Sequence, residues 1–371
     1  MTWREHLHMS NMFDYLKWRG DILFSQLPPN PVDALIFSTL SYIRFSDIVP
    51  DNPRQRISLR SAADALLEEP DAQERVRVKN DLELLTAAAG TARFGRVGLS
   101  FYQDVFIPEE DTQFAAITYY LEDNTAFLAF RGTDNTLVGW KEDFNMTFQE
   151  SIPSQRLARD YTLTFSAASR VPLHLGGHSK GGNLAVYAAA KYDRFTQKRI
   201  VTVYNQDGPG FTEQMMTDPG YLNIVPKVRT YVPQSSVFGM LLEHEEPYII
   251  IKSNQIGLMQ HDPYSWEVIG GDFIPEETLT ADSRFLDRTF RKWLAGMSTE
   301  ERNAFFDNVF DLLMIDNTSK PKDIMRPQNI RAYIKALHTD DTRRHLIASE
   351  LAKLLESAQR AQHEQSDHSS M

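Results

Sequence analysis

The sequence predicts an α/β fold, in which a mostly parallel β-sheet is covered by helices. Three observations lead to this class: a helical pattern before Gly90, aromatic and β-branched runs after it, and alternating short apolar strands and helices over 171–232. A chain of 371 residues, 42% of them apolar, is long enough to bury at least one substantial core.

Apolar residues before Gly90 recur at helical spacing. Helices are expected around 13–23, over 34–43 after Pro31, over 61–67, and over 72–89, where Gly90 ends the pattern. We therefore assign residues 1–90 to an N-terminal helical segment packed on the core.

After Gly90 the period changes to that of strands. The turn Glu122-Asp123-Asn124 between two apolar runs predicts a β-hairpin. Strands are expected over 97–107, 113–121, 125–130, 171–175, 199–204 and 227–232, and helices over 140–150, 155–169 and 182–192. Residues 91–274 are thus expected to form the α/β core.

From Pro275 onward the pattern is helical again. Amphipathic stretches occupy 285–294, 299–314, 330–338 and 343–358. We predict a C-terminal helical extension over 275–358 and a frayed polar tail over 359–371.

Charge and composition exclude several classes of protein. There are 39 Lys and Arg against 50 Asp and Glu, a net charge of −11, and no basic block that would suit nucleic acid. No window approaches the roughly 20 apolar residues of a membrane-spanning helix, and no signal peptide is seen. The absence of cysteine excludes disulfides, thiolate metal sites and cysteine nucleophiles. The simplest interpretation is a soluble cytoplasmic protein that needs no cofactor, and the sequence does not indicate its oligomeric state.

The most informative motif is Gly177-His178-Ser179-Lys180-Gly181, which lies between an apolar strand and an alanine-rich helix. A serine at a tight strand-to-helix turn needs neighbours without Cβ atoms, and the helix start offers backbone N–H groups to a developing oxyanion. The pattern predicts Ser179 as a nucleophile, Gly177 and Gly181 as elbow glycines, and the Lys180 N–H as an oxyanion donor. The alternative is a glycine-rich turn with an incidental serine.

Two segments carry a family resemblance. Gly-His-Ser-Lys-Gly-Gly-Asn at 177–183, and Ala-Phe-Arg-Gly-Thr at 129–133 followed by Gly139-Trp140 and Asp143, resemble an uncharacterised bacterial family of lipase-like α/β-hydrolases related to the class 3 (fungal-type) lipases. The resemblance covers roughly 11–268 and implies an α/β-hydrolase fold. It also implies that the N–H of Thr133 is the second oxyanion donor, although a strand exit with a structural ion pair would give the same residues.

The catalytic base should be a histidine downstream of Ser179. His261 lies in a loop closed by Pro263, and the Trp266 segment after it resembles the end of the class 3 lipases. We therefore predict His261 as the base, the alternative being a loop histidine bonded to its own turn. His244 lies in an acidic stretch where a solvated histidine is expected.

The acid is where this sequence departs from the lipases. Ser236 stands at the position where the resemblance implies a carboxylate, and a serine cannot stabilise an imidazolium in the same way. Asp207 ends the preceding predicted strand on the same edge of the sheet, so we predict that it is the acid. The alternatives are an Asx-capped turn at Asp207, a degraded triad, and the poorer candidate Asp262.

Four apolar residues lie between the predicted acid and the predicted base: Val237, Phe238, Met240 and Leu241. They are expected to line an acyl pocket or to act as a lid, and the alternative is ordinary core packing. The resemblance implies a serine hydrolase that cleaves small-molecule or lipid carboxylic esters through an acyl-enzyme intermediate. An acyltransferase or thioesterase would use the same serine. A catalytically degenerate binding or scaffold protein is the rival interpretation.

Overall fold

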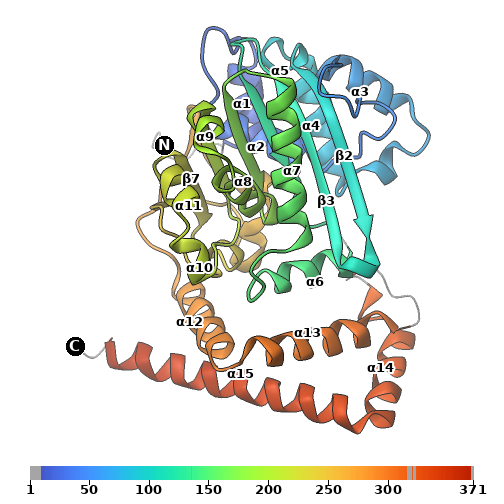
Figure 1. Cartoon of the computed structure of the whole chain (residues 1–371), viewed down its shortest axis with the longest axis vertical. Helices are drawn as coiled ribbons and strands as arrows, with labels where there is room; N and C mark the ends of the chain where they lie inside the picture. Colours follow the sequence, from blue (N-terminus) through green and yellow to red (C-terminus); the bar gives the residue numbers. More distant parts are fainter. Residues whose placement is uncertain (1–9, 135, 316–319, 321–322, 369–371) are drawn as a thin grey trace, which may run out of the picture. The chain divides into compact units, whose positions relative to one another are not determined.

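The computed structural model describes residues 10–134, 136–315, 320 and 323–368 (Figure 1). The chain forms two compact units. The first comprises residues 10–106, 114–132 and 154–279, and the second comprises the described residues of 107–113, of 133–153 and from 280 onward.

An eight-stranded sheet lies at the centre of the first unit, and its strands are ordered in space as they are in the sequence. From β4 to β8 all neighbouring strands are parallel, whereas β3 and β4 form an antiparallel pair. The strands are β1 (Ile57–Ser58), β2 (Gly98–Ile107), β3 (Thr112–Tyr120), β4 (Ala126–Phe130), β5 (Leu173–His178), β6 (Ile200–Gln206), β7 (Val228–Pro233) and β8 (Tyr248–Ile251).

Helices cover both faces of this sheet because the buried strand residues alternate between two cores. In β4, Phe127 and Ala129 pack in one core, while Leu128 and Phe130 pack in the other. The first core takes α1 (Met12–Arg19), α2 (Pro31–Leu40), α3 (Leu59–Glu68), α4 (Lys79–Gly90) and α5 (Ala92–Gly95). The second takes α7 (Pro153–Ala168), α8 (Lys180–Ala190) and α11 (Pro219–Ile224).

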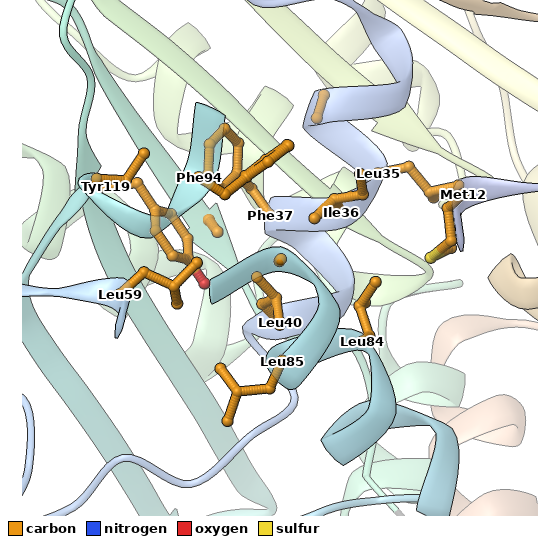
Figure 2. Packing of buried hydrophobic residues seen from close by; sticks show 14 of the residues in the cluster. Met12, Leu35, Ile36, Phe37, Leu40, Leu59, Leu84, Leu85, Phe94 and Tyr119 are labelled. Carbon is orange, nitrogen blue, oxygen red and sulfur yellow. The ribbon is translucent and has the colours of Figure 1, made fainter. Parts of the chain in front are cut away.

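The helix α2 lies across β4, β5 and β6. Figure 2 shows its side chain Phe37 among Phe94 and Tyr119, with ring centroids 5.3 and 4.6 Å away. This mostly parallel sheet, buried on both faces by helices, confirms the predicted α/β-hydrolase fold.

Three elements differ from the sequence-based expectations. The expected helix over 72–89 is split into a short 3-10 helix (Ala72–Arg75) and α4, because the Asp81 carboxylate accepts the backbone N–H groups of Arg77 and Val78 and begins a new helix there. The edge strand β8 was not expected, since it has only four residues. The helix α15 (Asp341–His368) continues past Gln359, where a frayed tail was expected; residues 369–371 lie outside the described part.

The second unit joins α6 (Leu137–Asn145) to the C-terminal helices. Those helices are α12 (Ala281–Ala295), α13 (Thr299–Leu313), α14 (Pro327–Thr339) and α15. Leu137 and Phe148 pack in one core with Phe306 and Phe310, and Lys141 forms an ion pair with Asp307 at 2.9 Å. The segment 133–153, assigned from sequence to the α/β core, thus packs within the second unit.

A buried ion pair fastens α2 to α5 in the first unit. Asn30 and Asp33 form a capping box at the start of α2, and Asp33 also accepts hydrogen bonds from Arg93 at 2.9 and 2.5 Å. Neither side chain of the pair is exposed to solvent. Arg93 further donates to the backbone carbonyls of Ile22 and Leu27. These bonds satisfy two charges that would otherwise be costly to bury.

We expect Arg93→Met to lower the free energy of unfolding by about 3–5 kcal/mol, because it leaves the Asp33 carboxylate buried without its cation. Lys17→Met, which breaks the exposed pair with Asp14, should change it by less than about 1 kcal/mol. Urea unfolding of the two variants beside the wild type measures both effects. Equal effects of the two substitutions would contradict the assigned role of Arg93.

Candidate active site

Ser179 lies at the sharp turn between β5 and α8. Its backbone has φ 59° and ψ −136°, a strained conformation for a residue with a Cβ atom. The turn is held by two hydrogen bonds: Ser179 N–H donates to the Gln206 carbonyl at 2.9 Å, and Gly182 N–H donates to the Ser179 carbonyl at 2.9 Å. A strained serine at a strand-to-helix turn is the geometry of a nucleophile elbow.

Two glycines permit this turn because backbone segments approach them closely. A Cβ atom at Gly177 would lie 2.2 Å from the carbonyl carbon of Gly181, and one at Gly181 would lie 2.1 Å from the carbonyl oxygen of Phe130. Both distances are far below van der Waals contact. The two predicted elbow glycines therefore lie where β4, β5 and the start of α8 meet.

The predicted oxyanion donors lie in different units. Lys180 is the first residue of α8, in the unit of Ser179, and its side chain is buried. In the second unit, the Thr133 hydroxyl donates to the Asp143 carboxylate at 2.6 Å. Gly132, the last residue of its segment in the first unit, is so close to the elbow that a Cβ there would lie 3.1 Å from the Cβ of Ser179. The oxyanion role of Thr133 stays a prediction.

The predicted base and acid contact each other directly. His261 ends a short 3-10 helix (Gly257–His261), and Asp207 follows β6 with φ 56°. The distance from His261 Nδ1 to Asp207 Oδ2 is 2.6 Å, and Asp207 is fully buried. An ionised carboxylate only accepts hydrogen bonds, so Nδ1 carries the proton and Nε2 is left to act as a base.

Ser236, at the position where the resemblance implied an acid, contacts Asp207 instead. Its hydroxyl donates a hydrogen bond to Asp207 Oδ1, the oxygen that His261 does not use. The same hydroxyl oxygen accepts the N–H of Gly239 at 3.0 Å. The serine that departs from the lipase pattern is thus a hydrogen-bond partner of the candidate acid.

His178, the residue before the nucleophile, is a participant that the sequence reasoning missed. Its Nε2 lies 2.8 Å from the carbonyl oxygen of His261, and its Nδ1 lies 3.1 Å from the hydroxyl of Tyr42. A carbonyl only accepts, so Nε2–H donates to it and Nδ1 accepts from Tyr42. Burial lowers the pKa of His178 well below its ordinary value, and the neighbouring His261 and Arg77 lower it further. His178 is therefore neutral and donates a hydrogen bond to the backbone carbonyl of His261, the candidate base.

The four residues predicted to form an acyl pocket or lid lie in different surroundings. Phe238 is 40% exposed, and its ring centroid lies 4.6 Å from that of His261. Met240 is buried in a small core with Val232 and Leu279. Val237 and Leu241 are half-buried. The sequence could not separate these environments because all four residues are apolar.

The loop that ends in His261 also exposes apolar side chains that the sequence analysis did not single out. Ile256 is 83% exposed, and Leu258 and Met259 are 58% and 62% exposed. All three are within five residues of the candidate base.

The expectation that His244 is solvated is wrong. Its side chain is buried, with Nε2 2.8 Å from the Gly239 carbonyl oxygen and Nδ1 3.2 Å from Glu246 Oε1. Burial raises the pKa of Glu246, but bonds from His244, Thr230 and Tyr221 outweigh it and lower the pKa below its ordinary value. The acidic stretch folds inward because Glu246 finds three partners there.

The described residues offer neither a metal-binding cluster nor a membrane-spanning helix. No group of three or more His, Asp or Glu side chains there could hold a metal ion. None of the described helices combines the length and apolar character needed to cross a membrane.

Comparisons with known proteins place the chain in a lipase-like family. The sequence model of the Mbeg1-like family, a lipase-like family, matches residues 88–311, which is more than half of the chain. A crystal structure of a mutant form of MDLA from Penicillium cyclopium is similar at 14% sequence identity and a TM-score of 0.38, covering 67% of this chain and 86% of that one. No curated protein matches the sequence.

Because backbone atoms crowd Gly181, we predict that a single added methyl group there strongly destabilises the fold. Gly181→Ala should lower the free energy of unfolding by about 3 kcal/mol or more, because the new Cβ would collide with the backbone of β4. Gly90→Ala is the matched control: nothing lies within 4 Å of a Cβ there, so it should be neutral or stabilise by up to about 1 kcal/mol. Thermal and urea unfolding distinguish the two, and a benign Gly181→Ala would refute the close approach.

The neutral His178 predicts how stability depends on pH. Because its pKa is lowered in the folded chain, the unfolded chain binds more protons below about pH 6.5. The free energy of unfolding should therefore fall as the pH decreases from there, with His178 contributing up to about 1.4 kcal/mol per pH unit. Urea unfolding from about pH 8 to about pH 5 should give a shallower decline for His178→Gln than for the wild type. Identical slopes would argue against a buried neutral His178.

Proposed function

Because this chain belongs to the lipase-like Mbeg1-like family, we propose that it is a serine hydrolase that cleaves carboxylic esters through an acyl-enzyme intermediate. The proposed nucleophile is Ser179, the base is His261 and the acid is Asp207. The observation that carries the proposal is the 2.6 Å contact between His261 Nδ1 and Asp207 Oδ2 in the unit that holds the strained Ser179.

In the proposed first half-reaction, His261 Nε2 takes the Ser179 hydroxyl proton as Oγ attacks the ester carbonyl carbon. The carbonyl electron pair moves onto oxygen, and the Lys180 N–H stabilises that charge. The intermediate collapses, the ester C–O bond breaks, and His261 gives its proton to the departing alcohol. Asp207 holds the imidazole in the reactive tautomer and stabilises its cation.

In the second half-reaction, His261 Nε2 removes a proton from water, and the hydroxyl oxygen attacks the acyl-enzyme carbonyl carbon. Collapse breaks the bond to Ser179 Oγ, which recovers the proton from His261. The products are a carboxylic acid and an alcohol, and the enzyme is restored.

The rival interpretation, a degenerate binding protein, drew its support from Ser236 at the expected acid position. The contact between Asp207 and His261 supports the hydrolase instead, because it supplies a carboxylate to the candidate base from the neighbouring strand β6.

A fluorophosphonate probe tests the proposal before any substrate is known. The wild type should gain the mass of one adduct, and Ser179→Ala should gain none, because only an activated serine reacts with the probe. On a short p-nitrophenyl ester, Ser179→Ala and His261→Ala should lose about a million-fold in kcat, and Asp207→Asn about ten-thousand-fold. Intact-mass spectrometry and steady-state kinetics provide the readouts.

Two exposed residues of α15 provide matched controls. Ser349→Ala and His345→Ala remove a serine and a histidine far along the chain from the elbow, and both should label and turn over as the wild type does. Folded wild-type protein that neither labels nor turns over esters would favour the binding protein. Labelling that survives Ser179→Ala would refute the assigned nucleophile.

A further inference from the structure

We propose that Ser236 is a positioning residue that orients the candidate acid Asp207 toward His261. The inference deepens the proposed function and rests on it for its catalytic meaning. The carboxylate of Asp207, which follows β6, contacts the loop that follows the next strand, β7.

The two oxygens of the Asp207 carboxylate have different partners. His261 Nδ1 donates to Oδ2 at 2.6 Å, and the Ser236 hydroxyl donates to Oδ1. Because β6 and β7 are parallel neighbours, their carboxyl ends lie at one edge of the sheet, where Asp207 and Ser236 meet. Donors on both oxygens prevent the planar carboxylate from rotating about its Cβ–Cγ bond.

The direction of the Ser236 hydrogen bond follows from its own partners. Its oxygen accepts the N–H of Gly239 at 3.0 Å, so its single hydrogen is available for the carboxylate, which can only accept. Ser236 is 2% exposed and Asp207 is fully buried, so bulk water does not compete at this contact. The hydrogen bond is charge-assisted, a class about twice as strong as a neutral one.

The loop from Ser236 to Gly239 packs directly on the carboxylate. A Cβ atom at Gly239 would lie 2.3 Å from Asp207 Oδ1 and 2.9 Å from Ser236 Oγ, so only glycine fits there. The Gly239 carbonyl in turn faces His244 Nε2 at 2.8 Å. The contact between Gly239 and His244 thus also helps to hold the loop in place.

The backbone of Asp207 needs such support. Its φ of 56° is left-handed, which is unfavourable for a residue with a Cβ atom unless the surroundings enforce it. The Asp207 N–H donates to the Tyr231 carbonyl of β7 at 2.8 Å. Strand β7 therefore holds the backbone of the acid, and the loop that follows β7 holds its side chain.

Loss of the Ser236 hydroxyl should have two consequences. The carboxylate becomes free to rotate, which should lower kcat/KM about 10- to 100-fold through kcat, with little change in KM. Its charge is also no longer shared with a hydroxyl, so it stabilises the His261 cation more strongly. The acid limb of the kcat/KM profile should therefore move to higher pH. Among the described residues, the rings of His178, which is neutral, and Phe238 also face the His261 ring.

The test compares Ser236→Ala, Ser236→Thr and Ser100→Ala in the full chain. Ser100 is a matched control: it is buried in β2, and its hydroxyl donates to the Asn52 carbonyl at 3.2 Å, away from the candidate triad. Hydrolysis of a short p-nitrophenyl ester is followed from about pH 5 to about pH 9. Ser236→Ala should show both the loss and the shifted limb, Ser236→Thr should recover most of each, and Ser100→Ala should show neither.

A proton NMR readout separates failure of this inference from failure of the proposed function. The Nδ1–H between His261 and Asp207 should give a low-field resonance that is absent in His261→Ala. If it moves or broadens in Ser236→Ala but not in Ser100→Ala, Ser236 positions the acid, even in a wild type that hydrolyses no ester. An unchanged resonance and an unshifted acid limb in Ser236→Ala would overturn the inference.

Discussion

The candidate site depends on the close approach of three backbone segments: the end of β4, the end of β5 and the start of α8. Glycines at 177 and 181 let these segments come nearer than any side chain would allow. The positive φ of Ser179 is a consequence, because the chain must reverse from strand to helix within that narrow space. The catalytic proposal, the predicted oxyanion donor at Lys180 and the placement of Gly132 all depend on this close approach of the three segments.

Around this close approach, polar contacts link residues at the carboxyl ends of neighbouring strands. Gln206 at the end of β6 accepts the N–H of Ser179, Asp207 contacts His261, and Ser236 contacts Asp207. His178 connects the elbow to the backbone of His261. Sequential strand order makes this possible, because each exit lies beside the next along a single edge of the sheet.

The fold was predictable because its signals are local: alternating strands and helices, and a glycine pattern with a steric reason. The pairing of Asp207 with His261 could be anticipated from the order of the strands, although its catalytic role stays a prediction. Other features depend on tertiary contacts. The direction of the His178 ring, the burial of Met240 and the inward folding of His244 are set by partners distant in sequence, and no periodicity reveals them. The split near Val78 depends on one carboxylate that captures two backbone N–H groups.

The second unit is assembled from separate stretches of the chain, and this limits how the protein can be divided. Its aromatic core takes Leu137 and Phe148 from between β4 and β5, and Phe305, Phe306 and Phe310 from after the sheet is complete. A chain shortened to end at Leu279 would keep the first two residues and lose the side chains that cover them. Removal of the C-terminal helices would therefore leave an uncovered apolar surface on the stretch that follows Thr133. The C-terminal helices therefore cannot be removed without exposing apolar side chains. They supply one part of a core, and the segment between β4 and β5 in the sequence supplies the other.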